Sequence, residues 1–298
     1  MKKHLLTTAL ALLTAACVLG QKINYQDDYG YNLRYNVNDD GTTVTCVGMV
    51  NKDDEEDIDL VIPSTVTYEG DSYSVTSIGD RAFPSCTILE TITIPSSVTS
   101  IEDRAFFNCN SLETITIPSS VTYIGSDVFS SCTSLETITI PNSVTSIGEG
   151  AFSSCTSLES ITIPSSFTSV GNRVFSGCTS LQYVTISSSV NSIGNGAFSS
   201  CTSLESITIP SSVTSIGEGA FSGCSSLGFI IIPNSVTYIG YRVFYNCYNL
   251  ESITIPSSVT YIGEGAFSYC DNLTSIIVSD DSPIKDDLIK EYGDKVEE

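Results

Sequence analysis

Histidine is almost absent from this sequence, and basic residues are scarce. The one histidine, His4, lies in an N-terminal stretch that we expect to be removed, so no imidazole remains for Ser-His-Asp or Cys-His catalysis or for a histidine-ligated metal. The 12 basic residues face 34 acidic ones, and this net charge of -22 disfavours nucleic acid and anionic membranes as partners. A phosphate-binding glycine motif and an acid–base constellation are missing too. The sequence therefore predicts a protein that is not an enzyme and needs no cofactor or metal.

Long apolar runs are also lacking, except at the N-terminus. Two lysines precede an apolar segment within residues 1–20, which is typical of a secretory signal peptide and too short to span a bilayer. Cys17 ends a lipoprotein-like box, TAAC, whereas small residues further on also fit ordinary cleavage before Gln21. We therefore expect an exported protein, either a cell-surface or outer-membrane lipoprotein acylated at Cys17 or a secreted one.

A repeat of 23 residues organises most of the chain. One unit, residues 201–223, reads CTSLESITIPSSVTSIGEGAFSG, and its neighbours are close copies. Ile207 and Ile209 alternate with polar residues, which predicts a short strand. Pro210 has no N–H group and ends the strand. We expect residues 219–221 to return along the opposite side as one short helical or 3-10 turn.

A single unit is too small to fold alone, because its few apolar side chains bury too little surface to offset the conformational entropy lost. Stacked coils share a core and join their strands into one parallel sheet. We predict a solenoid of about ten coils over residues 61–278, with a small hairpin inserted at residues 68–73.

Both ends of such a solenoid need a cover, because an open coil would expose core and strand edge. A turn at residues 38–41 between two alternating segments predicts a β-hairpin cap within residues 21–60. Ser282 and Pro283 resemble the start of a closing helix within residues 279–298. The apolar residues of that helix that we expect on one face are Ile284, Leu288 and Ile289.

The repeat pattern LxxIxIPxSVTxIGxxAFxxC resembles the BspA-like class of leucine-rich repeats, which is common in bacterial surface proteins. The resemblance covers roughly residues 61–278 in consecutive, in-phase copies. It implies an α/β solenoid, namely a right-handed horseshoe with a parallel β-sheet on its concave face. It also implies a role in adhesion or host interaction, and it brings no catalytic residues to transfer.

Cysteine forms a column in the repeat. We expect the nine side chains to point inward, where a thiol packs as a small hydrophobe. Coils stack closely enough for disulfides, and export favours oxidation. The number is odd, however, and stacked side chains point the same way, so we expect mostly reduced thiols, with occasional disulfides or a metal as alternatives. The cysteines are Cys86, Cys109, Cys132, Cys155, Cys178, Cys201, Cys224, Cys247 and Cys270.

Glutamate and threonine form two further columns. The glutamates at Glu90 and its repeats should form a solvated ladder, with shared calcium as the alternative. Outward threonines suit strands and predict a generic contact surface. That surface is interrupted by Tyr183, Phe229 and Ile231, which we take as a secondary candidate for partner binding.

Tyrosines crowd into the last units, where sister coils mostly carry small residues. Tyrosine and arginine are enriched at protein interfaces, so this crowding predicts a contact patch for a protein partner, although rings covering the C-terminal edge would give the same pattern. Tyr269 belongs to the same stretch. The candidate partner-binding residues are Tyr238, Tyr241, Arg242, Tyr245, Tyr248 and Tyr261.

Three classes of function follow from these features. The first is an exported binding protein for protein partners, with host extracellular matrix as one target. The second is a glycan-binding module or a structural scaffold of the cell envelope, because tyrosine patches also stack on sugars. The third, an enzyme, has no residues to support it. A membrane would be reached only through a lipid anchor at Cys17.

Overall fold

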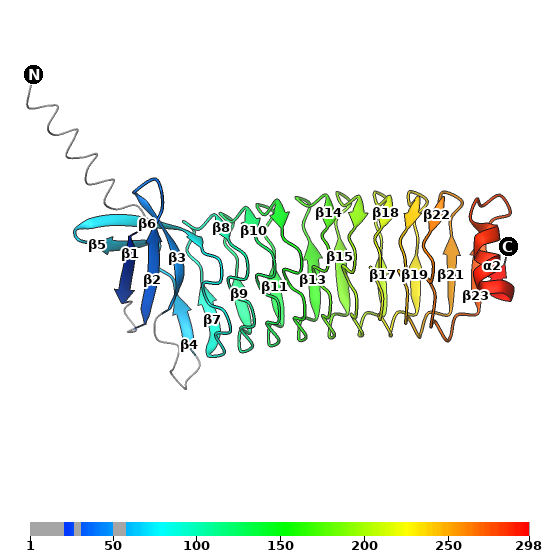
Figure 1. Ribbon diagram of the computed structural model, residues 1–298, viewed down its shortest axis with the longest axis horizontal. Helices are drawn as coiled ribbons and strands as arrows, with labels where there is room; N and C mark the ends of the chain where they lie inside the picture. The colour runs from blue at the N-terminus through cyan, green and yellow to red at the C-terminus, as the bar shows by residue number, and fades with distance from the viewer. Residues whose placement is uncertain (1–20, 27–30, 50–57, 298) are drawn as a thin grey trace, which may run out of the picture.

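The repeats stack as coils along one axis, with a β cap at one end and a helix at the other (Figure 1). The computed structural model describes residues 21–26, 31–49 and 58–297. The predicted signal peptide of residues 1–20 and its Cys17 lie outside the described residues. Successive coils place equivalent residues side by side at the 23-residue interval, so Thr114 pairs with Thr137.

An antiparallel sheet begins the described chain. In the turn between its second and third strands, the Asp40 carboxylate accepts hydrogen bonds from the N–H groups of Thr42 and Thr43 at 2.7 and 2.8 Å. The third strand then pairs in parallel with β6 (Asp71–Ile78), so this cap runs directly into the solenoid. The strands of the cap, in pairing order, are β1 (Lys22–Gln26), β2 (Asn32–Val37) and β3 (Thr43–Met49).

A hairpin interrupts the first coil. Strand β5 (Thr65–Tyr68) pairs antiparallel with the first half of β6, and Tyr68 lies opposite Asp71 across the turn. The last two residues of β6, Ser77 and Ile78, pair instead with the next coil. The insertion therefore lies outside the stack, as the sequence predicts.

Each coil contributes one strand to a parallel ladder on one side of the solenoid. We call the outward side chains of these strands the long-strand face. The alternation of apolar and polar residues buries the isoleucines and exposes the hydroxyl side chains between them. The strands are β4 (Ile58–Val61), β7 (Leu89–Thr93), β9 (Thr114–Thr116), β11 (Thr137–Thr139), β13 (Ser160–Ile163), β15 (Tyr183–Ile186), β17 (Ser206–Thr208), β19 (Phe229–Ile231), β21 (Ser252–Ile255) and β23 (Ser275–Val278).

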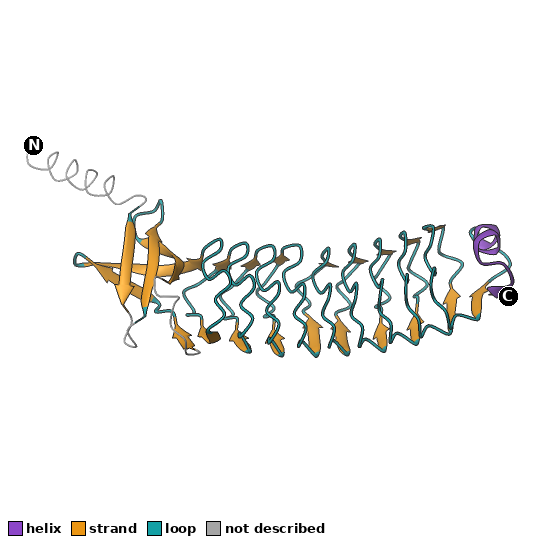
Figure 2. Cartoon of the chain, turned by 60° about the horizontal axis from the view of Figure 1, so that its bottom comes forward, coloured by secondary structure: helices purple, strands orange, loops and turns teal. Residues whose placement is uncertain are grey.

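A second parallel ladder, built from two-residue strands, follows another side of the coils (Figure 2). The prediction of a single parallel sheet is wrong here. After the proline corner the chain extends again, and stacking brings equivalent extended segments within hydrogen-bonding distance. We call the outward side chains of this ladder the short-strand face. Its strands after β6 are β8 (Ser100–Ile101), β10 (Tyr123–Ile124), β12 (Ser146–Ile147), β14 (Ser169–Val170), β16 (Ser192–Ile193), β18 (Ser215–Ile216), β20 (Tyr238–Ile239) and β22 (Tyr261–Ile262).

Both ladders are interrupted at the same junction. Strands β11 and β13 belong to separate sheets, and so do β12 and β14. In this coil Phe167 fills the inward position that Val144 and Val190 fill in its neighbours. A larger side chain in a close-packed interior displaces its surroundings, which accounts for the loss of strand pairing at this junction. A groove of about 630 Å³ lies on the long-strand face at this point.

The third side of each coil consists of turns, and we call it the turn face. Two positions per coil have a positive φ, for example Gly219 at 57° and Gly223 at 75°. Between them the N–H group of Phe221 donates to the carbonyl oxygen of Val243 in the next coil at 3.0 Å. Left-handed residues interrupt helical geometry, so these described segments form turns. The predicted helical or 3-10 turn is therefore wrong.

Phenylalanine forms the central stack of the core. Each ring is buried and lies nearly parallel to the next, with centroids 5.3 to 5.7 Å apart and planes within 11°. These separations fall in the favourable range for aromatic pairs. The rings are those of Phe83, Phe106, Phe129, Phe152, Phe175, Phe198, Phe221, Phe244 and Phe267.

The cysteine column packs inward against this stack, as predicted. From Cys109 to Cys270, each Sγ donates a hydrogen bond of 3.0 to 3.2 Å to a phenylalanine carbonyl oxygen, such as Cys178 to Phe152. Burial raises the pKa of the Cys178 and Cys224 thiols to about 12, because the core does not solvate a thiolate. A buried, protonated thiol of this kind is structural and unreactive.

Helix α2 (Lys285–Tyr292) closes the C-terminal end. On the turn face each coil donates to the coil that follows, so the last coil needs other acceptors. The Glu291 carboxylate accepts from the Gly265 N–H group at 2.7 Å, and the Tyr292 hydroxyl oxygen accepts from the Phe267 N–H group at 3.1 Å. The 3-10 helix η1 (Gly293–Lys295) and strand β24 (Val296–Glu297) follow, and β24 pairs with β23.

Helix α2 starts later than predicted. Ile284 rather than Ser282 occupies its N-cap position, without a side-chain cap, because Ser282 belongs to a preceding turn in which its carbonyl oxygen accepts from the Lys285 N–H group at 3.2 Å. Ile284 and Leu288 are buried, as predicted. Ile289 is 44% exposed because it lies about 100° further around the helix than Leu288.

We expect a fragment of residues 86–131 to be unfolded, because two uncapped coils bury too little surface and leave both ladder edges open. Circular dichroism should show no cooperative melting, whereas the complete solenoid of residues 21–298 should melt cooperatively. Cooperative melting of the fragment as a monomer would contradict the proposed dependence of each coil on its neighbours.

Buried cysteines should resist labelling in the native protein. The ten cysteines of the described chain should show little reaction with a thiol reagent until the protein is unfolded, and ten thiols should then react without any reductant. The measurement is a thiol count by mass spectrometry, with a reduced and unfolded sample as the control. Near-zero thiols in unfolded, unreduced protein would instead indicate disulfides along the column.

Candidate binding surfaces

The tyrosine-rich stretch of the sequence is distributed over two faces of the solenoid. Tyr238 and Tyr261 stand on β20 and β22 and belong to the short-strand face. Tyr241, Arg242 and Tyr245 follow the corner and lie on the turn face. Tyr248 is also exposed and lies in the turn after Cys247.

The two tyrosines of the short-strand face form one flat aromatic surface. Tyr238 and Tyr261 pair directly across β20 and β22, and their rings stack at 4.9 Å with planes 6° apart. Both rings are exposed on their outer side. Most sister coils carry serine at this position, and Tyr123 on β10 stands between Ser100 and Ser146, so the described chain has a stacked pair here in these two coils alone.

Arg242 organises the aromatic residues of the turn face. Its guanidinium carbon lies 4.7 Å from the centroid of the Tyr241 ring and 5.0 Å from that of the Tyr245 ring. Tyr245 in turn contacts Tyr269 edge to face at 5.1 Å. Cation–π contacts hold the arginine in place without neutralising it. Tyr269 was missing from the candidate residues, although it belongs to the same tyrosine-rich stretch of sequence.

The backbone under this cluster is strained. Arg242 has a φ of 52° and Tyr269 a φ of 59°; some sister coils have glycine at these two positions, as at Gly219, Gly223 and Gly265, and the others have arginine, aspartate, serine or asparagine. Large side chains in the left-handed region destabilise the backbone by about 1 kcal/mol or more. The fold therefore tolerates unfavourable residues at these positions in several coils, and at Arg242 and Tyr269 they present a guanidinium and a ring at the surface.

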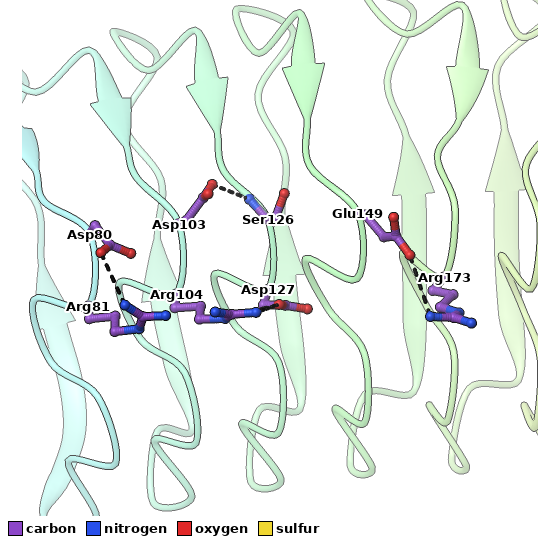
Figure 3. A network of polar contacts seen from close by, with 8 residues as sticks. All are labelled: Asp80, Arg81, Asp103, Arg104, Ser126, Asp127, Glu149 and Arg173. Atoms are coloured by element: carbon purple, nitrogen blue, oxygen red, sulfur yellow. Dashed lines mark hydrogen bonds and ion pairs between the residues drawn. The ribbon is translucent and has the colours of Figure 1, made fainter.

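Three other arginines share the left-handed position of Arg242 but contact carboxylates (Figure 3). The tightest of these ion pairs joins Arg104 Nη2 to Asp127 at 3.0 Å. Such exposed pairs add little stability. Among the ion pairs of the described residues, Arg242 does not appear, so its charge is turned toward rings and solvent. The other pairs are Arg81 with Asp80 and Arg173 with Glu149.

The long-strand face carries the secondary candidates. Tyr183, Phe229 and Ile231 are 70%, 58% and 62% exposed, which is more than most large apolar side chains of the described chain. Elsewhere on this face the same positions hold mainly serine and threonine. Large apolar side chains exposed next to one another on a soluble surface mark a contact site more often than scattered ones do.

The remaining columns have little chemistry of their own. The glutamates beside the long-strand face are mostly exposed and form a charged edge. Within residues 21–26, 31–49 and 58–297, histidine, cysteine and acidic side chains form no group of three that could hold a metal ion. The 630 Å³ groove is lined by hydroxyl, aliphatic and amide side chains, such as Thr139, Asn142 and Thr162, which provide hydrogen bonds but no acid or base.

The repeats of this solenoid match a known family of leucine-rich repeats. Residues 71–182 and 191–290 match the BspA type leucine rich repeat region in six copies, and the chain belongs to this family. No curated protein matches the chain. The candidate residues of this chain lie on outward positions of the solenoid.

Solved structures of similar bacterial proteins share the solenoid. A leucine-rich repeat protein from Bacteroides ovatus is 35% identical, with a TM-score of 0.74, and the match covers 83% of this chain and 70% of that one. A leucine-rich repeat protein from T. pallidum is 30% identical, with a TM-score of 0.52 and coverage of 73% and 87%. A leucine rich cell surface protein from Faecalibacterium prausnitzii is 26% identical, with a TM-score of 0.50 and coverage of 86% and 95%.

Proposed function

We propose that this chain is an exported, non-enzymatic protein that binds protein partners, with host extracellular matrix as one class of target. The observation that carries the proposal is the aromatic surface of the last coils, formed by the Tyr238–Tyr261 stack and by Arg242 between Tyr241 and Tyr245. Aromatic and arginine side chains supply most of the binding energy at protein interfaces.

The position of these rings supports a binding role rather than a capping one. The end of the solenoid is covered by α2, whose Glu291 and Tyr292 accept the hydrogen bonds of the last coil. The tyrosine rings of the short-strand face stack on each other instead of on that helix. Covering the C-terminal edge therefore does not require them, and binding is the better account of their exposure.

Export rests on the N-terminal sequence and on the family. The signal peptide predicted in residues 1–20 directs the chain out of the cytoplasm, and Cys17 provides a site for a lipid anchor. A similar protein from Faecalibacterium prausnitzii is described as a cell surface protein. In the described part of the chain, no helix has the length and hydropathy to cross a membrane. We infer attachment through Cys17 or release after cleavage before Gln21.

A glycan ligand or a scaffold role in the cell envelope is the second candidate. The flat stack of Tyr238 and Tyr261 is also suited to the apolar face of a sugar ring, and the guanidinium of Arg242 would bind hydroxyl or carboxylate groups. The same array of proteins and glycans tests both candidates, because it identifies which class of ligand binds.

Replacing five tyrosines by serine should weaken binding without unfolding the protein. The sister coils carry mostly small or polar residues at these positions, so the variant should keep its melting temperature within a few degrees. Affinity for a ligand found on the array should fall by about tenfold or more. The variant combines changes at Tyr238, Tyr241, Tyr245, Tyr248 and Tyr261.

The control for this variant is Tyr123→Ser, which removes a tyrosine of the same column as Tyr238 on the distant strand β10. Parent-like binding by the control and loss by the five-fold variant would support the proposal. Equal binding by both would place the contact elsewhere, and unfolding of the five-fold variant would assign the tyrosines to the cap.

The mature N-terminus should distinguish anchoring from secretion. Mass spectrometry of protein isolated from its native cells should find an acylated Cys17 or an N-terminal Gln21, free or cyclised. A Cys17→Ser variant should shift the protein from the membrane fraction to the medium if the lipid is its anchor. Recovery of an intact residue 1–20 segment in cytoplasmic protein would contradict export.

A further inference from the structure

One column of the long-strand face has an aromatic ring on either side of a gap. Tyr183 on β15, Ser206 on β17 and Phe229 on β19 occupy the same repeat position in three consecutive coils. The pairing of β17 with β19 places Ser206 directly beside Phe229. The two rings are therefore separated by one coil that carries a small hydroxyl side chain in place of a ring.

The width of the gap matches one inserted ring. Coils joined by paired strands lie about 4.8 Å apart, and these three coils are joined through β16, β18 and β20, so ring positions two coils apart are separated by roughly 10 Å. Where this protein has rings in adjacent coils, they stack at 4.9 Å on the surface and at 5.3 to 5.7 Å in the core. A ring placed over Ser206 would thus stack on both Tyr183 and Phe229 at the separation that the solenoid already uses.

Open space exists on the Tyr183 side of this gap. A groove of about 230 Å³ lies between β15 and β17, and its lining includes Tyr183, Thr185, Glu205 and Ser206. Strands β15 and β17 belong to separate sheets, so the groove lies at an interruption of the ladder. Ile231 stands two residues from Phe229 on the same side of β19 and adds apolar surface next to the gap.

The negative charge around the gap favours a partner in which basic residues flank the inserted ring. Glu205 lines the groove, Glu159 stands at the equivalent position two coils earlier, and both carboxylates are exposed. The whole chain carries a net charge of -22, which attracts cations and repels acidic chains. An aromatic ring flanked by lysine or arginine would fill the gap and would also pair its neighbouring cations with the glutamates. A neutral sugar would gain no binding energy from this charge.

We propose that Tyr183 and Phe229 form an aromatic clamp that binds one aromatic side chain of a basic polypeptide, with the ring seated over Ser206. This clamp deepens the proposed function, since it names the chemistry of a protein partner, but it does not use the tyrosine-rich surface of the last coils. Neither Tyr238 nor Tyr261 lies on β15, β17 or β19, so the two surfaces are separable by mutation.

The test uses the full mature chain and a short peptide with one tryptophan between lysines. The chain contains no tryptophan, so tryptophan emission reports the peptide alone. We expect saturable binding with a blue shift as the indole leaves water. Tyr183→Ser and Ser206→Phe should each weaken binding by about tenfold or more, the first by removing one wall and the second by filling the gap with the chain's own ring.

The matched control is Ser252→Phe. It adds the same ring in the same column, but on the other side of Phe229, and leaves the gap over Ser206 open. Binding by Ser252→Phe should equal that of the parent. Phe229 shows that a coil accepts this side chain, and melting curves of Ser206→Phe and Ser252→Phe should confirm equal folding.

Four results would overturn the clamp. These are parent-like affinity of Ser206→Phe, equal loss in Ser252→Phe, equal affinity for a peptide with tryptophan between glutamates or leucine between lysines, and preferential binding of a chito-oligosaccharide that Ser206→Phe blocks. The five-tyrosine variant should bind the lysine–tryptophan peptide as the parent does. Failure of the clamp would therefore leave the tyrosine-rich surface untouched, and failure of that surface would leave the clamp testable.

Discussion

Backbone hydrogen bonds between coils are the interaction on which this structure depends. They run in two directions: the Thr122 N–H group donates back to Thr99 at 2.9 Å, whereas the Phe106 N–H group donates forward to Val128 at 2.9 Å. No coil satisfies these groups internally, because each is a single turn of chain and the one hairpin, β5–β6, is an insertion in the first coil. The two caps follow from this requirement. At one end, β3 pairs with β6, the first strand of the short-strand ladder. At the other end, α2 supplies side-chain acceptors to the N–H groups of the last coil on the turn face.

Inward and outward positions of a coil are under different constraints. An inward side chain contacts copies of itself, as the phenylalanine rings do, so one exchanged residue affects its neighbours; Phe167 accompanies the one junction at which both ladders are interrupted. An outward side chain contacts mainly solvent. Serine can therefore become Tyr238 or Phe229 without disturbing the stack. Large exposed side chains are consequently found where the repeat is broken on the outside.

Much of the fold could be predicted from the sequence because the period appears in the residues that stack, namely cysteine, phenylalanine and the proline after each strand. The second ladder could not, because two-residue strands leave no alternating pattern. The tyrosine-rich stretch was misleading in another way. Tyr238 and Tyr241 are neighbours in sequence but lie on two faces, separated by the corner at Gly240. Tyr183 and Phe229 are far apart in sequence, yet their numbers differ by 229 − 183 = 46, twice the period, and this places them in one column.

Most internal junctions of the solenoid are made by the same backbone atoms with the same polarity, the interruption between β12 and β14 apart. If a coil in the middle were duplicated or lost, the coils on either side would still find equivalent backbone partners. Neither cap would change its contacts. Length is therefore adjustable in steps of one coil, each adding about 4.8 Å. The distance from the β cap to the exposed aromatic side chains of the last coils would lengthen or shorten by that step, while those side chains stay the same.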